Sequence, residues 1–325
     1  MFVYDGLYLL IEQIYLGNSD EVFSLYKNLK IVAVITTLIM VFVQIGGALV
    51  TKTGSAEGCG DSWPLCHGQL IPKDWPLDTI IEIAHRGVSG VAIIFLIIFG
   101  VMAWKQLSHI RETKFLVCVS LSFILIQSLI GAAAVVGLWH GEFVLAAHFG
   151  ISLICFAAVF VLTLLVFHVD LKYDTEGLII HKGLRRHTIG IIIYIYFVIY
   201  SGALVRHADA SLACTRWPHC MPHQIMPTNF YQAVQMGHRF LVLILFIWMV
   251  IAMIHVLRYY SNYRVIKNGW IIMMTLLVLQ IITGALTIFT YVNIFIALFH
   301  ALFITLIFGI LCYYILLISR PDYEP

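Results

Sequence analysis

The sequence predicts an all-α polytopic membrane protein with eight transmembrane helices, arranged as two pseudo-symmetric four-helix bundles. Three observations predict this fold. The 325 residues are 61% hydrophobic and only 11% charged, with a mean hydropathy of +0.96, whereas soluble domains are about half apolar and a quarter charged. The apolar runs are about 20 residues or longer and lack the alternation of barrel strands, so the backbone must close its hydrogen bonds in helices. Sequence motifs also recur at an interval of about 153 residues.

The N-terminal residues 1–28 are predicted to be an extension outside the bundles. The stretch from Leu7 to Leu16 is apolar but contains Glu12 and Gln13. It lacks the basic start and the small-residue cleavage site of a signal peptide. We therefore expect an interfacial helix or a loose extension, with a start site assigned too far upstream as the alternative.

The eight predicted spans cover residues 29–50, 79–104, 114–137, 142–168, 188–206, 231–257, 269–290 and 294–319. We predict an N-terminal bundle over 29–170, a cytoplasmic linker over 171–187 and a C-terminal bundle over 188–325. Lys and Arg are concentrated in the loops after even-numbered spans and beside both chain ends. The positive-inside rule therefore predicts that both termini are cytoplasmic and that loops 51–78 and 207–230 are external.

The two predicted bundles carry matching motifs. Gln127-Ser-Leu-Ile-Gly-Ala132 recurs as Gln280-Ile-Ile-Thr-Gly-Ala285, and Gly47-Ala-Leu-Val50 recurs as Gly202-Ala-Leu-Val205. The offsets are 153 and 155 residues, and two histidines of the first half recur at offsets of 153 and 152. Because each copy has four spans, we predict parallel repeats related by an axis near the membrane normal.

The recurring histidines are His85 and His148 in the first half, and His238 and His300 in the second. All four are predicted at similar depths from the external ends of their spans. A single buried histidine is usually a hydrogen-bonded core residue, but duplication of a pair favours a ligand set. Two imidazoles at one level from two helices suit a flat macrocycle bound on both faces, as in heme proteins, whereas zinc needs further ligands.

Four cysteines form two pairs in the predicted external loops, Cys59 with Cys66 and Cys214 with Cys220. An oxidising external face permits disulfides. For Cys214–Cys220 we favour a structural staple. For Cys59–Cys66 a staple and a redox-active pair remain equally open.

Glu82 distinguishes the two halves. It precedes His85 by three residues, so the two side chains share a helix face. The matching residue of the second half is Gln235, which cannot exchange a proton. Glu82 could be an interfacial carboxylate paired with Arg86, but we favour a catalytic role in activating water at the macrocycle edge.

Four basic residues are candidates for binding heme propionates, because Arg in particular can bond both oxygens of a carboxylate. They are Arg86, Arg239, Lys52 and Arg206. Arg86 and Arg239 could instead anchor helix ends among the lipid headgroups, and the sequence does not separate these roles.

The motifs GGALVTKTGSAEGCGDSWPLCHG, EIAHR, AAHFGISL, SGALVRH, QMGHR and ALFHALF occur in this order over residues 27–319. Together they resemble heme A synthase, closest to the type found in Bacillus-like bacteria. The resemblance implies an oxidoreductase that acts on a CH3 group, oxidising the C8 methyl of heme O to the formyl group of heme A. It further implies that His85 and His148 flank the substrate heme and that Glu82 serves catalysis. His238 and His300 would then ligate a resident heme b, and Cys59–Cys66 would take part in function.

Two successive two-electron oxidations would give a hydroxymethyl group and then a gem-diol, which loses water to form the aldehyde. An iron with imidazoles on both faces has no open position for oxygen. Either one histidine leaves, or the ring is oxidised and water attacks the exocyclic carbon while Glu82 takes the proton. The sequence leaves both routes open.

Candidate partners are the lipid bilayer, heme O as substrate, a heme O synthase that delivers it, an electron acceptor and a second copy of the chain. The formal charge of +2 gives no indication of a nucleic-acid partner. The main rival function is that of a diheme b-type membrane electron-transfer protein. That rival needs one heme near each face of the membrane, whereas all four predicted ligands lie towards the external side. A heme transporter is a third reading.

Overall fold

A computed structural model describes residues 26–139, 141–167, 180–222 and 226–319. Within these ranges, eight helices are long and apolar enough to cross a membrane. In chain order they are α3 (Lys27–Thr53), α4 (Leu77–Leu107), α5 (Arg111–Val135), α6 (Glu142–Val166), α8 (Lys182–His207), α9 (Phe230–Tyr259), α10 (Arg264–Phe289) and α11 (Ile294–Ser319), and a short 3-10 helix, η1 (Ser55–Glu57), follows α3. The all-α membrane fold with eight spans is confirmed. The expectations for residues 1–25 and 171–179 lie outside the described residues.

Several helices are longer than their predicted apolar spans. The largest difference is at α8, which begins at Lys182 rather than at residue 188. Polar first turns extend a helix beyond the hydrocarbon, because their side chains can reach the headgroup region. Residues 182–187 of the predicted linker are therefore helical. At the start of α9, the Asn229 side chain caps the helix by accepting the Gln232 N–H at 2.9 Å.

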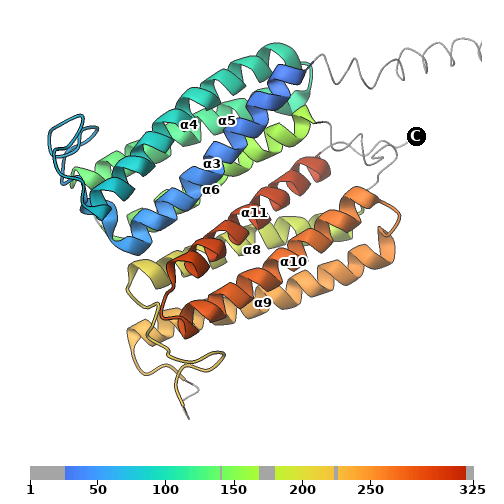
Figure 1. The fold of residues 1–325 in the computed structure, drawn as a ribbon. Coiled ribbons are helices and arrows are strands. Elements are labelled where there is room, and N and C mark those ends of the chain that lie inside the picture. The colour runs from blue at the N-terminus through green and yellow to red at the C-terminus, as the bar shows by residue number, and fades with distance from the viewer. Residues whose placement is uncertain (1–25, 140, 168–179, 223–225, 320–325) are drawn as a thin grey trace, which may run out of the picture.

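The helices lie in two groups in Figure 1, with α3–α6 in the upper group and α8–α11 in the lower. We call these the N-terminal half and the C-terminal half. Helices α6 and α11 pack across the boundary, and each also contacts a further helix of the opposite half. The middle of α6 is buried among its neighbours, with Leu153, Phe156 and Leu162 fully covered. Because this boundary is a continuous packed core, the division into two separate bundles stays a prediction.

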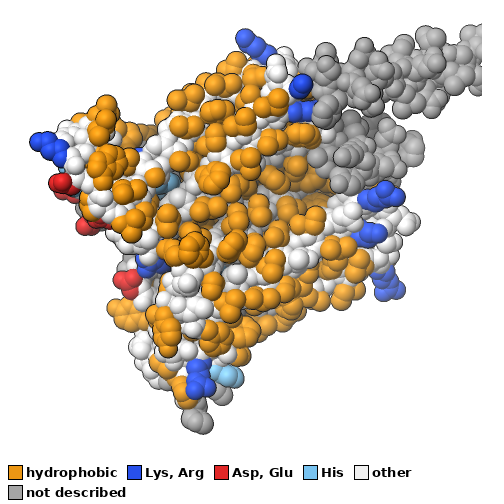
Figure 2. Space-filling model, in the orientation of Figure 1, with side chains coloured by type: hydrophobic (Ala, Val, Ile, Leu, Met, Phe, Trp, Pro, Cys, Tyr) orange, Lys and Arg blue, Asp and Glu red, His pale blue; other side chains and the backbone are white. Residues whose placement is uncertain are grey.

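The outer surface of the helices is apolar. Figure 2 shows a broad belt of hydrophobic side chains, with Lys and Arg gathered near its ends. Exposed members of the belt include Ile94, Phe115, Phe197 and Ile251. Such a continuous apolar surface is unfavourable in water and suits lipid. The chain is therefore a multi-pass membrane protein.

The connections that follow α3 and α8 lie at the same end of the molecule (Figure 1). The described start of α3 and the end of α11 lie at the opposite end. Each half has four spans, so the chain begins both halves at the same face, and the loop after the first span of each half lies at the opposite face. This arrangement brings both cysteine-containing loops to one face, above the ends of the helices that carry the predicted site.

Candidate functional site

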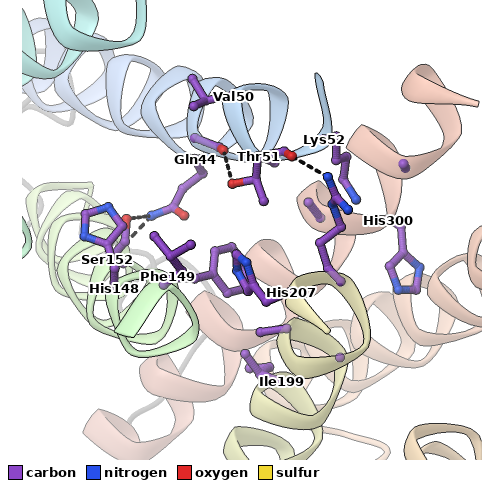
Figure 3. A pocket seen from close by; sticks show the side chains of 18 of the residues that line it. Gln44, Val50, Thr51, Lys52, His148, Phe149, Ser152, Ile199, His207 and His300 are labelled. Carbon is purple, nitrogen blue, oxygen red and sulfur yellow. Dashed lines mark hydrogen bonds between the residues drawn. The ribbon is translucent and has the colours of Figure 1, made fainter. Parts of the chain in front are cut away.

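A large cavity lies at the loop-bearing end of the helices and takes lining residues from both halves. Its volume is about 1620 Å³, above the 300–1,000 Å³ range usual for small-molecule pockets. All four predicted histidines line it, His85, His148, His238 and His300. Figure 3 shows part of the cavity, with His148 and His300 on either side of Phe149 and His207. The cavity is therefore large enough for more than one ligand of ordinary size.

Each predicted histidine packs against a glycine of the neighbouring helix. The distances from a Cβ built on that glycine to the nearest imidazole atom are 3.0 Å for Gly46 and His85, 3.3 Å for Gly131 and His148, 2.9 Å for Gly202 and His238, and 3.0 Å for Gly284 and His300. Any side chain at these positions would press on the ring, so only glycine lets each helix approach so closely. These glycines thus set the depth at which each imidazole sits.

In the C-terminal half, both histidines have hydrogen-bonded Nδ1 atoms. His238 Nδ1 lies 2.8 Å from Ser201 Oγ, and that hydroxyl donates to Val198 O at 2.7 Å. His300 Nδ1 lies 2.9 Å from Gln280 O and 3.2 Å from Thr283 Oγ1. Because Gln280 O and the already donating Ser201 can only accept, these contacts place a proton on each Nδ1. The Nε2 lone pair is then left free to bind a metal.

In the N-terminal half, the corresponding atoms are not held in this way. His85 Nδ1 and His148 Nδ1 are buried, and neither has a hydrogen-bond partner among the described residues. The Gln127 carbonyl lies near His148 without making a hydrogen bond of ordinary geometry. Unpaired buried polar atoms are uncommon in native proteins, so this difference between the halves calls for a functional reason.

Glu82 and Gln235 make the same backbone contact in their two halves. The Cys59 N–H donates to Glu82 Oε2 at 2.7 Å, and the Cys214 N–H donates to Gln235 Oε1 at 2.6 Å. Both side chains are buried. Each therefore fastens a cysteine loop to the helix that carries the histidine, and what distinguishes Glu82 is its charge. Glu82 also forms an ion pair with Arg86.

Both predicted disulfides are formed, Cys59 with Cys66 and Cys214 with Cys220. Arginines one turn below Glu82 and Gln235 hold the same loops. Arg86 Nη1 donates to the carbonyls of Ser62 and Leu65 at 3.0 and 2.7 Å. Arg239 Nη1 contacts three loop carbonyls at 2.9 to 3.1 Å, those of Arg216, Pro218 and His219. Arg239 Nη2 is buried without a hydrogen-bond partner among the described residues.

Two further cations come together between the halves. Arg206 Nη2, from α8, donates to Thr51 O at the end of α3 at 2.5 Å. Lys52 follows Thr51 and lies close enough to Arg206 for their charges to interact, and both side chains line the cavity (Figure 3 labels Lys52 and Thr51). Arg206 Nη1 lies 3.4 Å from Asp209 Oδ1, whereas its Nε is buried and unpaired within the described ranges. Two positive charges beside an open cavity favour an anionic group there.

The chain is similar in sequence to known proteins over most of its length. A family model described as cytochrome oxidase assembly protein matches residues 30–312. A heme A synthase of Macrococcus caseolyticus is 60% identical over 295 residues, which cover 90% of this chain and 98% of the relative. Heme A synthases of Staphylococcus haemolyticus and Geobacillus thermodenitrificans are 52% and 51% identical, and the alignments cover 96% and 94% of their lengths. The chain belongs to the heme A synthase family.

The region shared with the heme A synthase family contains every predicted site residue. Most of them line the cavity, namely Glu82, His85, Arg86, His148, His238, Arg239, His300, Lys52, Arg206 and Cys66. Cys59, Cys214 and Cys220 lie in the loops that cover it and are fully buried. The structure therefore brings together residues from six of the eight helices.

Sequence reasoning missed the residues that support the histidines. Gly131, Gly202 and Gly284 were visible only as anchors of the repeat, and so was Gly47, which lies beside Gly46 with its Cβ position 3.4 Å from His85 Cε1. The repeat motifs did indicate these contacts, because a glycine present in both copies of a transmembrane motif indicates that two helices pack closely there. Ser201 and Thr283 gave no signal of their own, since helical Ser and Thr usually bond only the preceding turn.

Proposed function

We propose that this protein is a heme A synthase that oxidises the C8 methyl of heme O to a formyl group within the membrane. The observation that carries this proposal is the difference between two otherwise matching halves. Both place a histidine pair on one cavity, and only the N-terminal half adds a carboxylate, Glu82, where its counterpart has Gln235. Relatives up to 60% identical over nearly their whole length are named heme A synthase, which supports the same conclusion.

The proposal places one heme in each half, because each half contributes a histidine pair to the lining of the cavity. In the proposal His85 and His148 hold the substrate heme O, while His238 and His300 hold heme b. Heme b, when bound, supplies a one-electron carrier. The unpaired nitrogen atoms, Arg239 Nη2 and Arg206 Nε, are available to heme propionates, with Lys52 beside them.

The proposed chemistry consists of two balanced steps. A methyl group and one water give a hydroxymethyl group, two electrons and two protons. A second water gives a gem-diol with the release of two more electrons and two protons, and loss of water then leaves the formyl group. Glu82 takes a proton from the attacking water, and its contacts with Cys59 N–H and Arg86 hold the carboxylate in one orientation. The electrons go to an acceptor outside the chain.

The orientation in the membrane belongs to the same proposal. Both termini are cytoplasmic, and the disulfide loops face the external side, where an oxidising environment preserves them. The N-terminal domain (29–170) is catalytic, and the C-terminal domain (188–325) keeps heme b. A heme O synthase supplies the substrate.

Conversion of heme O tests the proposal directly. Purified full-length protein in lipid vesicles is supplied with heme O and an electron acceptor, and extracted pigments are separated by reversed-phase chromatography. We expect a pigment with the mobility and mass of heme A. Recovery of unchanged heme O from protein that has bound it overturns the proposal and favours the electron-transfer or transport readings.

The glycine beneath His238 gives a second test. Gly202→Ala places a methyl carbon 2.9 Å from His238 Cε1, so the ring must move. Overpacking of this kind costs about 1–3 kcal/mol, and we expect heme b content to fall roughly 5-fold or more under limiting heme. Gly237→Ala is the matched control, because a Cβ there meets nothing within 4 Å. Equal heme b content in the two variants would show that close packing does not position His238.

A further inference from the structure

The residues that contact the two histidine pairs differ between the halves. Gly202-Ala-Leu-Val repeats Gly47-Ala-Leu-Val, so Ser201 corresponds to Gly46. Gln280 to Ala285 repeats Gln127 to Ala132, so Thr283 corresponds to Ile130. At both positions the C-terminal half has a hydroxyl side chain and the N-terminal half has a residue without a hydroxyl.

Both hydroxyls lie against a histidine Nδ1. Ser201 Oγ is 2.8 Å from His238 Nδ1, and Thr283 Oγ1 is 3.2 Å from His300 Nδ1. Each hydroxyl is itself fixed, since Ser201 donates to Val198 O and Thr283 donates to Leu279 O at 2.8 Å. Neither imidazole can rotate without breaking these bonds. The ring plane and the tautomer are therefore set before any metal binds.

The N-terminal half lacks this support at the same places. Gly46 takes the place of Ser201 and has no side chain. A Cβ built on Gly46 would lie 3.0 Å from His85 Nδ1, so the side chain that bonds the histidine in the C-terminal half is absent at this position. His85 Nδ1 and His148 Nδ1 are buried and make no hydrogen bond within the described part of the chain. His85 is held by packing, and His148 has the Gln127 carbonyl nearby but not the hydroxyl that Thr283 adds beside His300.

We propose that Ser201 and Thr283 are positioning residues that make the C-terminal half retain its heme, whereas Gly46 and Ile130 leave His85 and His148 free to release theirs. This inference rests on the proposed function, in which one half keeps a cofactor and the other must exchange substrate for product. A hydrogen bond to the outer nitrogen of a metal-bound histidine orients the ring and raises its basicity, and its loss typically reduces metal affinity 10–100-fold. One fold can thus contain a permanent site and an exchanging site.

The test uses isosteric removal of each hydroxyl in the full-length protein. Ser201→Ala and Thr283→Val are purified with their pigments, and an excess of apomyoglobin captures heme that dissociates. We expect heme b to be lost roughly 10-fold faster in each variant and up to about 100-fold faster in the double variant. The midpoint potential of heme b should rise, because a less basic imidazole stabilises the ferric ion less. Thr283→Ser keeps the hydroxyl, so its rate of heme b loss and its midpoint potential should match those of the unchanged protein.

Thr275→Val is the matched control. It removes a hydroxyl from the same helix, one that donates to Ile271 O in the preceding turn, so heme loss and potential should match the unchanged protein. The reciprocal variant, Ile130→Thr, is loaded with heme O, and release from the N-terminal half should slow. Unchanged heme b retention and potential in the Ser201→Ala, Thr283→Val double variant overturn the inference.

The heme O conversion assay on the same preparations separates this inference from the proposed function. If heme b is lost faster but no heme A forms in the unchanged protein, only the proposed function fails. If heme A forms normally and heme b retention is the same in all variants, only the inference about Ser201 and Thr283 fails.

Discussion

His238→Ala is expected to yield a protein without the absorption spectrum of a bis-histidine heme b, and His300→Ala should do the same. In the proposed site each of these two helices contributes one imidazole to the lining of the cavity. Both rings are fixed in advance by Ser201, Thr283 and Gln280. Removing either ring leaves one face of the iron unligated beside a cavity large enough to admit water.

The measurement is the reduced-minus-oxidised spectrum of purified protein, with heme quantified after extraction. His255→Ala is the control, because His255 lies at the opposite end of α9 from His238, against His187 and Tyr259. Its spectrum should be unchanged. His85→Ala should keep the heme b spectrum and lose conversion of heme O. An unaltered spectrum in both C-terminal variants would rule out His238 and His300 as the ligands.

Glu82→Gln is expected to keep both hemes and lose heme A formation. The chain itself shows that Gln fits this position structurally, because Gln235 accepts the Cys214 N–H just as Glu82 accepts the Cys59 N–H. The substitution therefore preserves the loop contact and removes the negative charge, which is both the proton acceptor and the partner of Arg86. Positioned general bases contribute roughly 10²–10⁴-fold, so conversion should fall by at least about 100-fold.

Two further variants separate the two roles of Glu82. Glu82→Ala removes the loop contact as well, so it should also lose conversion and in addition loosen the Cys59–Cys66 loop towards limited proteolysis. Gln235→Glu serves as the control and should convert heme O normally. Heme A formation at the normal rate by Glu82→Gln would refute proton transfer by this residue. If only Glu82→Ala were inactive, Glu82 would be an anchor for the loop.

The eight spans could be predicted from the sequence because a bilayer permits few backbone solutions. Runs of about 20 apolar residues can only be helices when every N–H and C=O must be paired within the segment. The ends were less predictable, as the early start of α8 at Lys182 shows. Polar residues in the headgroup region fit either a helix or a loop, so hydropathy does not locate the boundary.

The histidine pairs and the cysteine pairs were also predictable, because the repeat supplied two independent examples of each. Glu82 was found by the same comparison, as the residue at which the copies differ. Its contact with the Cys59 backbone was not predictable, since it joins residues separated by 23 positions through a loop that has no regular structure.

The sequence by itself therefore determined that this is an eight-span membrane protein of the heme A synthase family with two histidine pairs and one distinguishing carboxylate. The tertiary structure decided which atoms surround those histidines. Ser201 reaches His238 across 37 positions, and Arg206 reaches Thr51 across 155. Such contacts depend on how far each helix is rotated about its own axis. Hydropathy does not report that rotation, because in lipid the outward and inward faces of a helix are both apolar and only close packing of small residues selects between them.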